Sequence, residues 1–142
     1  MSSLLARARA DIEISRILLS DEGNPTHDEM ITDQAAYHAQ QAIEKALKYQ
    51  TEMLGMEYRK VHNLVGLIPP LEKNGFTVSE ELKSKAYFIS DWEASSRYND
   101  DFSAVRADIE DAIRLYEELE KQILNRLNDN KNEDESEIDD KL

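Results

Sequence analysis

Apolar residues recur every three or four positions along most of the chain, which is the spacing of a helix with one buried side. No stretch of useful length alternates apolar and polar residues as a strand does. The pattern predicts helices over residues 3–19, 27–54, 79–96 and 103–127. A further helix is expected to start at His62 or Asn63 and to end at Asn74 and Gly75. We therefore expect an all-α fold, an antiparallel bundle of four to five helices.

The predicted helix ends carry recognisable local signals. Thr26 stands three residues before Glu29, a spacing that lets the two side chains cap each other's backbone amides at a helix start. Gly55 is placed to end the long second helix. Pro69 and Pro70 fall inside the third helix and remove two amide donors, so we expect a kink or a break there.

One face of each helix is predicted to form the core. In the second helix this face is rich in alanine, which lets a neighbouring helix approach closely. The predicted inward residues are Leu4, Leu5, Ala8, Ile12, Leu18 and Leu19; Ile31, Ala35, Ala39, Ala42, Ile43, Ala46, Leu47, Met53 and Leu54; Leu82, Ala86, Ile89 and Trp92; and Val105, Ile109, Ala112, Tyr116, Leu119 and Ile123.

A polar stripe runs along one flank of the second helix. Its members recur at three- and four-residue spacing, which places them on one edge of the helix: Gln34, His38, Gln41, Lys45 and Lys48. Such a stripe is either a solvated face or the lining of a groove or partner contact. The sequence leaves both interpretations open.

The charge is strongly negative and unevenly distributed. The chain has 17 Lys and Arg against 30 Asp and Glu, a net charge of −13. Seven acids and two lysines fall in the last fourteen residues, so residues 1–128 still carry −8. An acidic body repels free polyanions, and we expect no DNA binding; any RNA contact requires a local basic patch or one completed by a second chain. Residues 129–142 are predicted to be a disordered acidic tail after a domain of residues 1–128.

Several classes of protein are disfavoured by what the chain lacks. It has no cysteine, so disulfide and thiolate chemistry are not expected. No apolar run approaches the roughly 20 residues of a membrane span, and we expect a cytoplasmic protein with no membrane contact. No Glu stands three residues before any of the three histidines, which argues against a di-iron bundle. We predict neither a metal site nor a cofactor.

The segment "SSRYNDDF", residues 95–102, joins the last two predicted helices. Arg97 and Tyr98 either lock this corner, through a carboxylate or helix-end carbonyls and by packing on the second helix, or contact a ligand phosphate together with Lys45 and Lys48. His62 is likewise either a helix-start residue or a ligand contact.

Three segments in this order resemble the HEPN domain family: "YHAQQAIEKALKYQTEMLG", "VHNLVGLIPPLEKNG" and "SSRYNDDFSAVRADIEDAIRLYEELEKQI". The family name stands for higher eukaryotes and prokaryotes nucleotide-binding. The resemblance extends from the first helix to about residue 127 and implies a HEPN-like helical bundle that commonly pairs as a homodimer. It also implies, as a frequent partner, a minimal nucleotidyltransferase that is fused or encoded nearby in prokaryotes.

One branch of that family consists of ribonucleases, often toxins of toxin-antitoxin pairs, with an arginine followed about four to six residues later by a histidine. After Arg97 those positions hold Asp101, Phe102 and Ser103, and no histidine follows His62 anywhere. The resemblance therefore implies a branch without the ribonuclease motif, which acts by dimerisation and by binding a partner or a nucleotide. The alternative is a ribonuclease toxin whose histidine comes from another helix. The candidate ligand- or partner-binding residues are His38, Gln41, Lys45, Lys48, His62, Arg97 and Tyr98, with no catalytic residue assigned.

Overall fold

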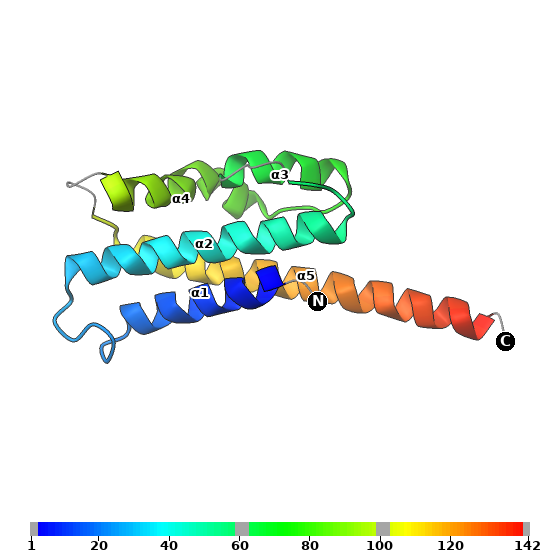
Figure 1. Cartoon of the computed structure of the whole chain (residues 1–142), viewed down its shortest axis with the longest axis horizontal. Helices are drawn as coiled ribbons and strands as arrows, with labels where there is room; N and C mark the ends of the chain where they lie inside the picture. The colour runs from blue at the N-terminus through cyan, green and yellow to red at the C-terminus, as the bar shows by residue number, and fades with distance from the viewer. Residues whose placement is uncertain (1–2, 59–62, 99–102, 141–142) are drawn as a thin grey trace.

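The computed structural model describes residues 3–58, 63–98 and 103–140, with side chains described for residues 4–58, 63–95 and 103–129. The described residues form five helices and no strand: α1 (Ser3–Leu19), α2 (Glu29–Met53), α3 (Leu64–Lys73), α4 (Glu80–Tyr98) and α5 (Arg106–Asp140). The predicted all-α bundle is thus confirmed. Figure 1 shows α5 extending beyond the other helices at its C-terminal end.

Helix α2 is the centre of the bundle, because it contacts all four other helices. Its alanines are the reason that neighbours come close: Ala35, Ala39, Ala42 and Ala46 are all completely buried. Against them packs α1, where the Ser15 hydroxyl donates to the Ala35 carbonyl at 2.8 Å across the two helices. A chain this short thus builds a continuous core around a single long helix.

The start of α2 differs from the prediction. Asp28 rather than Thr26 caps the helix, since its side chain accepts from the amides of Met30 and Ile31 at 2.8 and 3.2 Å. His27 has a positive φ of 51° and is therefore not helical, which prevents a start at residue 27. The expected reciprocal cap of Thr26 with Glu29 is therefore wrong.

Other predicted helix ends are confirmed. Asn63 caps α3 by accepting from the Gly66 amide at 2.6 Å, and Gly55 follows α2 with φ of 75°. Helix α3 continues through Pro69 and Pro70, so the chain does not break there. Both prolines lie on the exposed side, as do Val65 and Gly66, whose carbonyls they leave without an amide donor. Water can satisfy these carbonyls at the surface.

The predicted core is mostly correct and fails at two helix ends. Val105 is 59% exposed because α5 begins only after it, and Met53 is 47% exposed as the last residue of α2. Trp92 and the other inward residues predicted for α4 are buried. Helix α5 is longer than predicted, since it continues to Asp140 through residues 129–140, where we expected a disordered tail. A tail that is separate from the domain of residues 1–128 stays a prediction.

Candidate functional site: the polar face of α2

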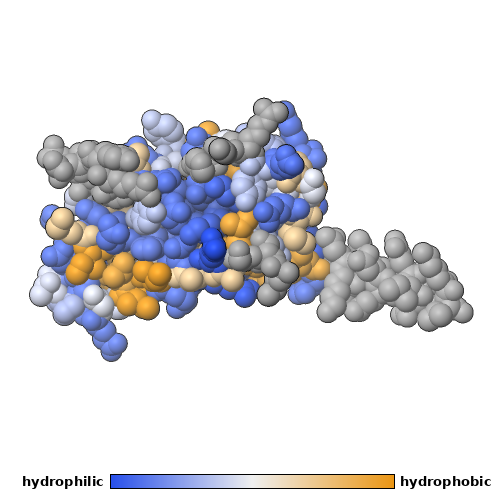
Figure 2. Space-filling model, in the orientation of Figure 1, coloured by the Kyte–Doolittle hydropathy of each residue, from blue (hydrophilic) through white to orange (hydrophobic). Residues whose placement is uncertain are grey.

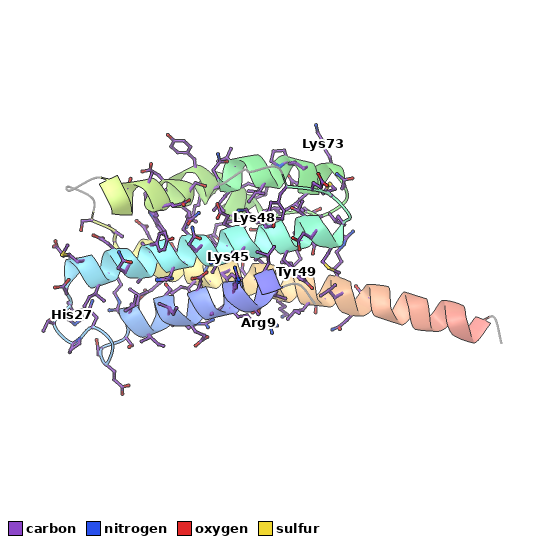
Figure 3. All side chains as sticks on the ribbon, viewed as in Figure 1. Arg9, His27, Lys45, Lys48, Tyr49 and Lys73 are labelled. Atoms are coloured by element: carbon purple, nitrogen blue, oxygen red, sulfur yellow. The ribbon has the colours of Figure 1, made fainter. Side chains whose placement is uncertain are left out.

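The polar side of α2 is tied to α1 by one carboxylate. Asp11 lies on α1 with only 11% of its side chain exposed, and its Oδ1 is 2.9 Å from Nδ1 of His38. Its Oδ2 accepts from the Lys45 ammonium. His38 and Lys45 are seven residues apart, two helical turns, so one carboxylate between them reaches both. Figure 3 shows Lys45 and Lys48 along the middle of α2.

The hydrogen bond that Asp11 accepts from His38 also orients the imidazole. A neutral histidine that donates its Nδ1 proton to a carboxylate keeps Nε2 as an acceptor. The His38 side chain is 24% exposed, and its ring meets that of Tyr37 edge-on, with 5.3 Å between centroids. The arrangement is therefore a fixed and partly accessible histidine.

Lys48 is held by a second carboxylate, that of Glu44 on α2 itself. Its ammonium is 3.7 Å from Oε2 of Glu44, whose side chain is only 5% exposed, and it stands 5.3 Å from the centroid of the Tyr58 ring. Burial raises the pKa of Glu44; Lys48 opposes this shift and the charge of Glu93 adds to it. The carboxylate thus keeps its proton to a higher pH than an ordinary glutamate does.

Two glutamines complete the polar face. Gln41 donates to the side-chain oxygen of Gln40 at 2.7 Å. The side-chain nitrogen of Gln40 and Oε1 of Glu44 are buried and have no hydrogen-bond partner among the described residues. Since a buried polar group without a partner is costly, this part of the helix is not optimised for stability alone.

The structure brings together only some of the predicted site residues. His38 and Lys45 share Asp11, and Gln41 and Lys48 lie along the same side of α2. Arg97 and Tyr98 belong to the last turn of α4, but their side chains, like all of His62, lie outside the described part of the chain. The expected contact between Arg97 and the lysines of α2 therefore stays a prediction.

A groove between α3 and α4 lies next to these positions in the chain. It has a volume of about 540 Å³ and is lined by Asn63, Val65, Gly66, Tyr87, Ser90, Asp91 and Ala94. Asn63 directly follows His62, and Ala94 stands one helical turn before Arg97. Ser90, one of the lining residues, accepts from the Leu64 amide at 2.8 Å, which joins the two helices. Tyr87 is 79% exposed.

Sequence reasoning missed Asp11 and Glu44, the two acids that organise the face. The signal was present in both helices. Asp11 falls on the inward side of α1 among Ala8, Ile12 and Ser15, and Glu44 follows the core residue Ile43. An acid at an inward position is rarely left without a cation, and lysines stand one and four residues after Glu44.

Comparison with known proteins agrees with this architecture. The family model of the HEPN domain matches residues 1–128. The chain belongs to the HEPN domain family. The match covers all five helices up to the part of α5 that extends beyond the others. No curated protein and no solved structure matches the chain significantly.

Membership in the HEPN family links the chain to nucleotide- or RNA-related roles in general. Among the described residues, no group of three or more His, Asp or Glu side chains is arranged to hold a metal ion. The described helices also include none that is long and apolar enough to cross a membrane.

Proposed function

We propose that this HEPN domain acts by binding, as a homodimer that holds a partner, and that it does not cleave RNA. The observation that carries the proposal is the internal pairing of the polar face. Asp11 contacts both His38 and Lys45, and Glu44 pairs with Lys48. A phosphate entering this face would have to compete with carboxylates that already neutralise its cations.

The charge of the chain supports the same proposal. A polynucleotide approaching a protein of net charge −13 is repelled at long range. Cleavage of a phosphodiester without a metal also requires a proton-transferring group beside a cation that meets the developing charge. Arg97 has no histidine after it in the sequence, and Asp100 and Asp101 follow it closely. A protein partner, by contrast, tolerates an acidic surface.

A minimal nucleotidyltransferase is the partner that the family resemblance favours. Such an enzyme handles a nucleotide itself, so its helical partner requires no phosphate-binding loop of its own. A nucleotide held at the edge of α2 by Lys45, Lys48 and Arg97 is the related form of this proposal. It requires the lysines to exchange their internal carboxylates for the ligand.

The deciding experiment combines an activity assay with recovery of partners. Purified protein is incubated with single-stranded RNA, and the tagged chain is used to recover partners from its host. We expect no cleavage above a buffer control and recovery of a nucleotidyltransferase. Arg97→Ala is expected to change stability or partner affinity rather than a rate. Recovery of RNA in place of a nucleotidyltransferase would contradict the proposal.

A second candidate, an RNA-cleaving toxin with a displaced site, is favoured by one feature. Asp11 orients His38 through Nδ1, as a general base is oriented, and Lys45 shares the same carboxylate. Cleavage that is lost in Arg97→Ala and also in His38→Ala or His62→Ala would support this candidate and exclude the non-catalytic proposal.

A further inference from the structure

The outward face of α1 is an exposed stripe that no other described helix covers. Helix α1 packs on α2 and α5, which leaves a third side facing solvent. Arg7, Ala10, Ile14 and Ile17 recur there at three- and four-residue spacing, with Ile14 38% and Ile17 57% exposed. Figure 2 shows a connected hydrophobic area over the C-terminal half of α1.

Asp21 continues this stripe past the end of the helix. The turn after α1 keeps a helical hydrogen bond, since the Asn24 amide donates to the Ser20 carbonyl at 2.9 Å. Asp21 within that turn has a side chain that is 87% exposed, and its only described contact is with His27 at 3.8 Å. The stripe thus begins with a cation, is apolar in the middle and ends with an anion.

Arg7 is unpaired in the described part of the chain, unlike the other two arginines of α1. Arg9 pairs with Glu120 and Arg16 pairs with Glu117, both across to α5. These ion pairs join α1 to α5 and neutralise the charges of Arg9 and Arg16 within the chain. Arg7 is exposed and stands two helical turns before Ile14, on the same outward face of α1. Its charge is therefore available to a partner.

Helix α1 carries a net positive charge although the chain as a whole is acidic. The residues of α1 include three basic and two acidic side chains, a net charge of +1. The residues of α5 include five basic and thirteen acidic side chains, a net charge of −8. Because like charges in contact are costly, self-association through α5 is disfavoured and association through α1 is not.

We infer that two copies pair through α1, packed antiparallel about a two-fold axis at Ile14. This inference rests on the dimerisation in the proposed function and names its surface. In that register Ile14 meets the partner's Ile14, and Arg7 meets the partner's Asp21. Ala10 lies beside the partner's Ile17, where a small side chain lets the helices approach closely.

The order of residues along the stripe is what identifies a second copy as the occupant. The stripe is basic at one end, apolar in the middle and acidic at the other end. A two-fold axis makes the second copy run antiparallel, so the basic end of each stripe faces the acidic end of the other. Each dimer then gains two identical ion pairs at the rim and an apolar centre, the usual anatomy of an interface. A parallel arrangement would place like charges together.

Charge reversal tests the pairing directly. Arg7→Glu and Asp21→Arg each turn two attractive contacts into repulsive ones, and each is expected to weaken dimerisation about tenfold or more. The double variant Arg7→Glu with Asp21→Arg restores the pairing in reversed sense and should dimerise nearly as the unmodified chain does. Both single changes suit the dipole of α1, an acid near its start and a base near its end, so the fold should be kept.

The apolar centre is tested with a matched pair of lysine substitutions. Ile14→Lys places two ammonium groups at the two-fold axis and should give a monomer, although it lowers the net negative charge. Met53→Lys changes the charge equally at a 47% exposed residue at the end of α2 and should leave the dimer intact.

Sedimentation equilibrium over a range of concentrations measures each variant, and circular dichroism verifies its helix content. A dimer that withstands Ile14→Lys and both charge reversals would overturn the α1 surface but not dimerisation. Failure of the double variant to restore a weakened dimer would overturn the register. An unmodified chain that stays monomeric would overturn the α1 surface together with the dimerisation on which it rests.

Discussion

Replacement of Asp11 by alanine removes the carboxylate that joins α1 to the polar side of α2. Hydrogen bonds to charged groups contribute about 1.5–3 kcal/mol each to stability when they are buried. The partners here are His38 and Lys45, whose side chains are 24% and 25% exposed. Both regain much of their hydration when Asp11 is lost, so we expect a total loss of roughly 2 kcal/mol rather than the sum.

For a domain of this size, 1 kcal/mol corresponds to about 3–5 °C in melting temperature, so Asp11→Ala should melt about 6–10 °C lower. Urea unfolding followed by circular dichroism gives the free energy directly. The matched control is Glu13→Ala on the same helix, whose side chain is 62% exposed and whose loss should cost less than about 0.5 kcal/mol. If the two variants lose the same stability, the shared carboxylate is not a fixed joint and the reasoning is refuted.

Three further predictions concern other parts of the chain. Burial raises the pKa of Glu44, so above the ordinary glutamate range the native state binds more protons than the unfolded state, and stability falls as pH rises through the raised pKa. Glu44→Gln should remove this fall and stabilise the protein at pH 7. A lower urea midpoint for the variant at pH 7 would contradict this prediction. Gly23→Ala would place a Cβ 1.9 Å from the backbone oxygen of Ile17, so thermal unfolding should show a loss of about 2 kcal/mol or more; a neutral result would show that this turn rearranges at little cost. Deletion of residues 129–142, which mostly continue α5 beyond the bundle, should leave the melting temperature nearly unchanged because that segment gains little from packing; a drop of several degrees would show that it docks on the domain.

The helices were predictable because their signal is local. A buried face repeats every three to four residues, and Trp92 or Ile109 can be assigned to the core from neighbours in the sequence alone. The errors lie where a helix stops. Val105 fits the period of α5 but precedes its first turn, and Thr26 fits a capping pattern that the backbone of His27 does not allow.

Only the residues that α2 contributes to the candidate site were predictable from the sequence. The spacing of His38 and Lys45 placed them on one edge of a helix, but their common partner Asp11 is on another helix, 27 residues away from His38. The spacing of residues within one helix does not show which residue of another helix they contact. The same limit applies to Glu44, whose role follows from its burial and from the charge of Glu93 on α4.

The contact pattern of α2 also determines how the molecule opens. Helix α2 touches every other described helix. Among these helices α3 contacts only α2 and α4, and it has two residues without an amide proton. Local opening should therefore begin with the detachment of α3, while amides in the middle of α2 exchange with solvent only when the whole domain unfolds. The groove between α3 and α4 would then be the place where the two helices separate, in a small fraction of molecules, while the rest of the bundle stays closed.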